Sequence, residues 1–218
     1  EGAFARWLRR RLSGGEREAG PIGVLAAEDP LGIVGSLREL AQLRRGRPTA
    51  RPPTVDLSLR PDLEFIDAVD AFERWFASGP GELRTADLLG ELRSLAEFFR
   101  DSLARPRTFE ELWRLARPPR TSFMKSQGLD WRAYALKGAW RAAAGADGAA
   151  LFEAARELHG ACRVTFSALM GQIAGALIAE VSGSLDELLD DYAARKRAAA
   201  ALDFDDLLLG ARRLVGEH

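Results

Sequence analysis

Apolar side chains recur every three or four residues along almost the whole chain, and this spacing constrains the fold more than any other feature of the sequence. It is the period of an amphipathic α-helix, whereas a half-buried strand alternates every second residue. The best strand signal, at residues 22–25, is short and reads equally well as a loop. The sequence therefore predicts an all-α fold, an irregular multi-helix domain of about eight helices with loops rich in proline and glycine.

Local signals predict where several helices begin. Asp29 is a predicted N-cap, with Pro30 at the first position of a helix that reaches about Arg45. Pro61 opens a second helix, and Thr108 begins a third as the cap of a capping box. Further along, we expect one helix over residues 149–181 and another over 185–200, with a break between them.

A proline-rich connection at residues 46–60 cannot be helical and suggests a boundary. We expect a basic N-terminal helical segment over 1–60, a main helical domain over 61–200, and a final helix over 201–218. The apolar run 164–179 falls short of the roughly 20 residues that a bilayer needs, so we expect a buried helix and no membrane partner. One cysteine allows no internal disulfide, which favours the cytoplasm.

Basic residues are unevenly distributed, although the net charge is only −1. They exceed acidic residues in segments 1–60 and 100–141, and arginine forks suit phosphate contacts. One predicted DNA contact is the loop 117–128 with its aromatic neighbour, and a second is the basic end of the first segment. The candidate residues are Arg117, Arg120, Lys125, Trp131 and Arg132, and then Arg44, Arg45, Arg47 and Arg51. The alternatives are a surface loop with Trp131 in the core, and a solvated linker.

Other chemistry-bearing residues favour structural roles. His159 and Cys162 supply two metal ligands where zinc needs four, so we expect both to pack in the core. Trp113 lies on a helical face and is also expected in the core, as are Trp7, Trp75 and Trp140. The sequence predicts no catalytic residue and no metal site.

The C-terminal segment reads as a well-capped amphipathic helix. Asp203 precedes it, and Asp205 and Asp206 lie in its first turn, where the helix dipole favours negative charge. Phe204, Leu207 and Leu208 begin its apolar stripe.

The string from Tyr192 through Lys196 to Leu202-Asp203-Phe204-Asp205-Asp206-Leu207-Leu208 resembles the Y-x-x-x-K…LDFDDLL pattern of UvrD/RecB/AddA-type superfamily 1 DNA helicases. The resemblance implies a 1B-type inserted helical domain that contacts single-stranded or forked DNA beside a motor. It also implies that the motif residues Tyr192, Lys196, Asp203, Phe204, Asp205, Asp206, Leu207 and Leu208 serve folding and docking rather than chemistry.

The sequence has no phosphate-binding P-loop and no DE-x-x box, and it begins with Glu1. We therefore expect a piece of a larger bacterial helicase of double-strand-break repair, without a RecA-like motor core. The piece needs no cofactor, whereas its parent would use ATP and Mg²⁺. The implied partners are DNA, the motor domains of the same parent chain and a second helicase–nuclease subunit.

Two other classes of function stay open. A helical scaffold that never meets DNA fits the near-neutral charge. An all-helical magnesium-dependent enzyme would need the acidic clusters at 186–191 and 203–206 to face each other, and neither Asp190-Asp191 nor Asp205-Asp206 completes a D-D-x-x-D motif.

Overall fold

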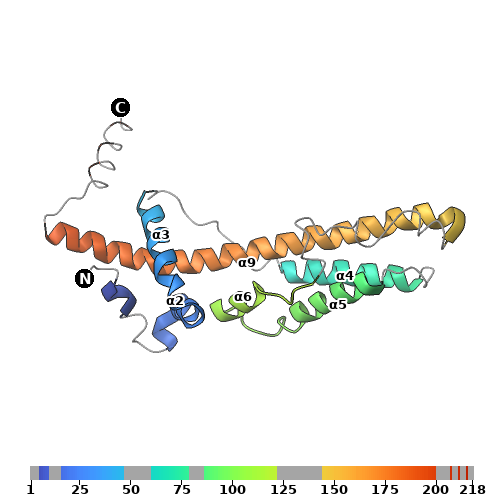
Figure 1. Cartoon of the computed structure of the whole chain (residues 1–218), viewed down its shortest axis with the longest axis horizontal. Coiled ribbons are helices and arrows are strands. Elements are labelled where there is room, and N and C mark those ends of the chain that lie inside the picture. The colour runs from blue at the N-terminus through green and yellow to red at the C-terminus, as the bar shows by residue number, and fades with distance from the viewer. Residues whose placement is uncertain are drawn as a thin grey trace. The chain divides into compact units, whose positions relative to one another are not determined.

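The computed structural model describes residues 5–9, 16–46, 60–78, 86–121 and 144–199, and positions 207, 211 and 215. This part of the chain is 87% helical and contains no strand, which confirms the all-α class (Figure 1). The chain divides into two compact units, described separately below. Unit 1 comprises residues 1–54 and 177–218, and unit 2 comprises residues 55–176. The sequence-based division had instead placed 61–200 in one domain.

Unit 2 is built on a helical hairpin of α4 (Pro61–Ser78) and α5 (Ala86–Arg100), which pack against each other (Figure 1). Asp70 pairs with Arg100 at 2.8 Å, and Glu73 pairs with Arg93 at 2.5 Å. The later residue on α4, Glu73, pairs with the earlier residue on α5, Arg93. The two helices therefore run antiparallel. The predicted start of α4 at Pro61 is confirmed.

The core of unit 2 is centred on three phenylalanines from three helices. The ring centroid of Phe65 lies 5.8 Å from that of Phe99 and 5.3 Å from that of Phe166, and Phe99 and Phe166 are 6.3 Å apart. Phe166 belongs to α9 (Gly148–Ala198), which follows the short 3-10 turn η3 (Gly145–Asp147). Aromatic pairs at such distances add to the stability that comes from apolar burial.

Helix α6 (Phe109–Leu115) begins at the predicted cap. Thr108 Oγ1 accepts a hydrogen bond from the backbone N–H of Glu111 at 3.3 Å. The Glu111 carboxylate does not complete the capping box, because it binds Arg114 instead. The prediction of Thr108 as the N-cap is therefore confirmed. The other hydrogen bond of a capping box, from the Thr108 backbone N–H to the Glu111 carboxylate, is not formed.

Unit 1 contains α2 (Glu16–Glu28), α3 (Gly32–Gly46) and the second part of α9. Its core brings residues from both ends of the chain together: Trp7, Leu8, Ile22, Leu37, Ala41, Leu185 and Leu188. This explains why the two compact units differ from the expected domains. Trp7, Ile22 and Leu37 are buried in one cluster with Leu185 and Leu188, which lie more than a hundred residues further along the chain.

Helix α2 occupies the region of the weak strand signal. Ile22 is fully buried in the unit 1 core, so tertiary packing overrides the modest preference of β-branched residues for strands. Gly20 adopts a φ of 51°, which kinks the helix just before Pro21. At the start of α3, Asp29 Oδ1 accepts a hydrogen bond from Gly32 N at 2.9 Å, as an N-cap does.

Helix α9 runs unbroken over 51 residues, so the expected break between 181 and 185 is wrong. Its buried positions in unit 2 follow a three-and-four spacing that runs through Ile173 and Ala176. In unit 1 the same spacing continues through Leu177, the partly buried Val181 and Leu185. The apolar stripe therefore crosses residues 181–185 without interruption, and the Ser-Gly-Ser string at 182–184 only resembles a helix end in the sequence.

By length and composition alone, α9 is apolar enough to cross a membrane. Its most apolar 18-residue window has a mean hydropathy of 1.5, and 39% of that window is buried inside the structure. A core helix of a soluble protein meets the same criterion.

Candidate nucleic-acid interface

The structure describes part of each predicted DNA-contacting set. Within the described residues lie Arg44, Arg45, Arg117 and Arg120, and the motif residues Tyr192, Lys196 and Leu207. Outside them lie Arg47, Arg51, Lys125, Trp131 and Arg132, and the motif residues Asp203, Phe204, Asp205, Asp206 and Leu208.

An aromatic and cationic column extends along α6 and past its C-terminal end. Phe109 and Trp113 stack with an interplanar angle of 9° and centroids 6.4 Å apart. The guanidinium carbon of Arg117 lies 4.6 Å from the Trp113 ring centroid, and Arg117 Nε donates a hydrogen bond to the Trp113 carbonyl oxygen at 3.3 Å. Arg120 is exposed three residues later. The column holds the exposed Arg117 cation in a defined place over the Trp113 ring, and Arg120 supplies another exposed cation nearby in the sequence.

Trp113 contributes to this column, although the sequence placed it in the core. The side chain is only partly buried, and its indole Nε1 has no hydrogen-bond partner within the described residues. The signal that would have revealed this role is the spacing of Phe109, Trp113 and Arg117 at i, i+4 and i+8, which places them on one helix face.

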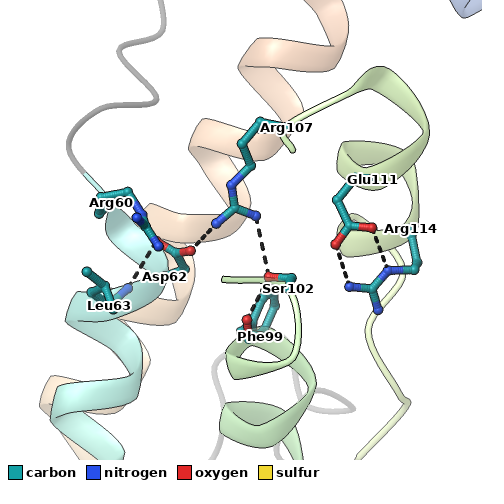
Figure 2. Close-up of polar contacts among 8 residues, drawn as sticks. All are labelled: Arg60, Asp62, Leu63, Phe99, Ser102, Arg107, Glu111 and Arg114. Atoms are coloured by element: carbon teal, nitrogen blue, oxygen red, sulfur yellow. Dashed lines mark hydrogen bonds and ion pairs between the residues drawn. The ribbon is translucent and has the colours of Figure 1, made fainter. Parts of the chain in front are cut away.

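An ion pair between Glu111 and Arg114 also stabilises helix α6. Arg114 donates hydrogen bonds from Nε and Nη2 to the two carboxylate oxygens of Glu111 at 3.0 and 2.7 Å, as Figure 2 shows. The hydrogen bond from Arg114, opposed by burial, lowers the pKa of Glu111 below its ordinary value, and Glu111 raises the pKa of Arg114. Arg114 also lies over the ring of Phe98, 4.6 Å from its centroid. These contacts anchor α6 to α5.

In unit 1, Arg44 is held by a protein carboxylate. Its Nε and Nη2 donate to the two carboxylate oxygens of Asp186 at 3.1 and 3.4 Å, and its side chain is only 19% exposed. This ion pair joins the C-terminal end of α3 to α9. Arg44 thus has a structural role in the described structure, whereas the sequence had grouped it with the DNA contacts.

Arg45 forms a separate cluster with the motif residues Tyr192 and Lys196. The sequence analysis had assigned Arg45 to a different group, the predicted DNA contacts. The guanidinium carbon of Arg45 lies 4.9 Å from the ring centroid of Tyr192, and Lys196 Nζ lies 5.1 Å from the same centroid. Leu207, the other described motif residue, is helical and 58% exposed.

The residues considered for metal binding lie in different environments. His159 and Cys162 are buried in unit 2; burial, helped by Arg163, lowers the pKa of His159 to about 4, and burial raises the pKa of Cys162 to about 12. Asp186 pairs with Arg44, and Asp191 pairs with Arg195 at 2.9 Å. Across the described ranges, no group of three or more His, Cys, Asp or Glu side chains is placed to hold a metal ion.

The most buried polar cluster is structural in character. Asp62 Oδ1 accepts hydrogen bonds from Arg60 Nε at 3.3 Å and Leu63 N at 3.1 Å, and Oδ2 accepts from Arg107, which also donates to Ser102 (Figure 2). A cavity of about 20 Å³ beside this cluster is lined by Asp62, Arg107 and Gln172 among others. Its volume suits about one water molecule, so it is too small for a substrate.

Comparison with known proteins adds no relative from which to transfer a role: no family model, curated protein or solved structure matches the chain.

Proposed function

We propose that the chain is a DNA-contacting accessory domain that works beside an ATP-driven motor, as the 1B-type insertion of UvrD/RecB/AddA-type helicases does. In this proposal the chain acts in the bacterial cytoplasm, in double-strand-break repair. It guides single-stranded or forked DNA, while ATP and Mg²⁺ are used by motor domains elsewhere in the parent protein. The Tyr192–Leu208 string supports the choice of family.

The observation that carries the proposal is the Phe109–Trp113–Arg117 column, followed three residues later in the chain by the exposed Arg120. Stacking on Trp113 restricts where the Arg117 guanidinium can lie, so less side-chain entropy is lost when it binds a phosphate. Proteins that bind single strands combine such cations with aromatic side chains. Arg114, bound to Glu111 within α6, lies over the Phe98 ring of α5, and this contact holds the helix that carries the column to its neighbour.

The test is fluorescence anisotropy of labelled single-stranded, duplex and forked DNA over a salt series. We expect weak binding whose affinity falls with salt, because each phosphate contact releases counterions. Replacing both Arg117 and Arg120 by Gln should lower the slope of log affinity against log salt by about 0.7 for each contact on a single strand.

Two exposed arginines of the same unit serve as matched controls. Arg74 lies on α4, and Arg156 lies on α9 with its side chain 59% exposed and paired with Glu153. The variant with both Arg74→Gln and Arg156→Gln loses the same charge away from α6 and should keep the wild-type salt slope. If the salt slope falls equally in the two double variants, DNA binding depends on net charge and not on the column. No binding to any of the three DNAs at low salt would reject the proposal.

A helical scaffold is the second candidate, and one observation favours it. The side chain of Val164 is 63% exposed on α9, and the neighbouring positions Ala168 and Gly171 on the same face are exposed too. An uncharged helix face of this kind suits a protein partner. Failure of DNA binding together with capture of the motor domains of a helicase would favour this candidate.

A further inference from the structure

We propose that Arg105 and Arg107, in the connection between α5 and α6, form an anion site of unit 2 that binds one phosphate group. The two residues precede α6 in the chain, whereas the aromatic and cationic column begins on α6 and extends past its end. That the phosphate belongs to a nucleic-acid backbone rests on the proposed function. The anion site itself rests on the arrangement of arginines around two buried carboxylates.

Each of these carboxylates is contacted by two arginines. Asp62 pairs with Arg60 and Arg107. Glu111, whose side chain is 9% exposed, pairs with Arg105 and Arg114. The two carboxylates therefore offset only half of the charge of the four guanidinium groups. Because the four arginine side chains are between 25% and 52% exposed, the excess positive charge faces the solvent.

The excess remains when the exposed acidic residues nearby are included. Residues 100–121 contain six arginines and three acidic residues, Asp101, Glu110 and Glu111. One of the six arginines, Arg100, pairs with Asp70 on α4. The segment that leads into α6 and passes beyond it therefore keeps a net positive charge, which favours an anionic ligand.

Arg105 adds little to the ion pairs themselves. Arg114 already donates hydrogen bonds to both carboxylate oxygens of Glu111, at 3.0 and 2.7 Å. Arg105 Nη1 lies 3.8 Å from Glu111 Oε2, beyond hydrogen-bonding distance, and its side chain is 52% exposed. An exposed ion pair of this length contributes little to stability. Across the described residues the Arg105 guanidinium donates no hydrogen bond, so its N–H groups stay available to a ligand.

Arg107 supplies a second cation near the first. The hydrogen bond from Arg114, opposed by burial, lowers the pKa of Glu111. The positive charges of Arg105 and Arg107 lower it further, so both guanidinium groups lie near this one carboxylate. Arg107 is held by hydrogen bonds from its two Nη atoms to its buried ion-pair partner and to Ser102 (Figure 2). A guanidinium group that is already positioned loses less freedom when it binds a phosphate oxygen.

The experiment uses the whole chain. Arg105→Gln removes one cation of the site and leaves the hydrogen-bonded ion pairs intact, and Arg105→Lys keeps the charge. Arg74→Gln is the matched control, because Arg74 is an exposed arginine of the same unit on α4. Melting curves by circular dichroism establish that each variant folds.

A second pair of variants separates the charge of Arg107 from its structural role. Arg107→Gln and Asp62→Asn both break the same buried ion pair. The first removes a cation from the site and should weaken anion binding, whereas the second removes a negative charge and should not weaken it. If the two variants weaken anion binding equally, Arg107 acts only through the fold, and its place in the site is overturned.

The first readout is the melting temperature in inorganic pyrophosphate, which needs no nucleic acid. Pyrophosphate should raise the melting temperature of the wild type, of Arg105→Lys and of Arg74→Gln, and raise it less in Arg105→Gln. No rise in the wild type, or an equal rise in Arg105→Gln, would overturn the site. The second readout is the anisotropy of a labelled oligothymidine over a salt series. Arg105→Gln should lower the salt slope by about 0.7, while Arg105→Lys and Arg74→Gln keep it.

The outcomes separate this site from the proposed function. If the wild type binds no DNA but its stabilisation by pyrophosphate depends on Arg105, the anion site stands, its ligand is a free phosphate compound, and the DNA-guiding role falls. If DNA binding depends on Arg117 and Arg120 and neither readout changes in Arg105→Gln, this site is overturned alone. Competition by oligoglutamate as strong as that by an oligonucleotide of equal charge would show an acidic protein partner and overturn the phosphate assignment.

Discussion

Asp62 and Arg107 form an ion pair in which one partner is buried and the other is not. Asp62 is 2% exposed at the start of α4, whereas Arg107, between α5 and α6, is 25% exposed. Arg107 also donates to Ser102 Oγ at 3.4 Å, and Ser102 Oγ donates to the Phe99 carbonyl oxygen at 2.6 Å. The pair thereby fastens the connection before α6 to the first turn of α4.

This asymmetry predicts unequal costs for breaking the pair. Arg107→Met leaves a buried carboxylate whose remaining side-chain partner is Arg60, and it should lower the free energy of unfolding by about 3–5 kcal/mol. Asp62→Leu leaves a guanidinium that water can reach, and it should cost only about 1–3 kcal/mol. The double variant should recover part of the larger loss. Urea unfolding of the three variants measures these values, and equal costs would contradict the role of burial.

Sequence patterns predicted the features that depend on neighbouring residues. Pro61 and the apolar spacing after it defined α4, and Thr108 marked the start of α6. What the sequence could not show depends on contacts between distant positions. The Arg44–Asp186 pair spans 142 residues, so no local pattern reveals that Arg44 is held by a carboxylate.

The length of α9 was missed for a related reason. The exposed Gly183 and the two serines beside it resemble a helix end. Only the packing of Val181, Leu185 and Leu188 in the unit 1 core shows that the apolar stripe continues past this string.

Gly183→Ala tests this continuity. A Cβ at position 183 meets no atom within 4 Å, and glycine in a helix interior costs roughly 0.5–1 kcal/mol relative to alanine. The substitution should therefore raise the free energy of unfolding by about that amount. Gly171→Ala on the same helix also meets no atom within 4 Å and serves as the control. A gain at Gly171 with none at Gly183 would indicate a real break at 182–184.

Cys162 should report on the opening of unit 2. The thiol is the only one in the chain, it is fully buried, and burial raises its pKa to about 12. We expect negligible reaction with a thiol reagent in native buffer, because both access and thiolate are lacking. Reaction should appear with the urea unfolding transition. Rapid stoichiometric labelling of the native protein at neutral pH would contradict the burial of Cys162.

His159 should make the protein less stable in mild acid. Burial, with a smaller effect of Arg163, lowers its pKa from the ordinary 6.5 to about 4 in the folded protein. Between these values the unfolded chain binds the proton and the folded chain does not. The contribution is thus intact above pH 6.5 and is lost as the pH falls toward 4, at up to roughly 1.4 kcal/mol per pH unit.

The measurement compares wild type with His159→Leu by urea unfolding at several pH values. Carboxylates titrate in both proteins, so only the difference between the two reports on His159. The difference should change between pH 6.5 and 4 and be constant above. A constant difference over the whole range would show that His159 is protonated equally in both states.

Trp113→Leu separates the orientation of Arg117 from its charge. The substitution removes the ring below the guanidinium but keeps the cation, and an exposed cation–π contact contributes about 0.5–1 kcal/mol. DNA affinity should fall by about two- to fivefold with the salt slope unchanged, since no phosphate contact is lost. Arg117→Gln should lower the slope itself. Trp113→Phe keeps a ring at this position and should lose less affinity than Trp113→Leu. If Phe and Leu weaken binding equally, stacking on the ring does not position Arg117, and the charge alone accounts for its contribution.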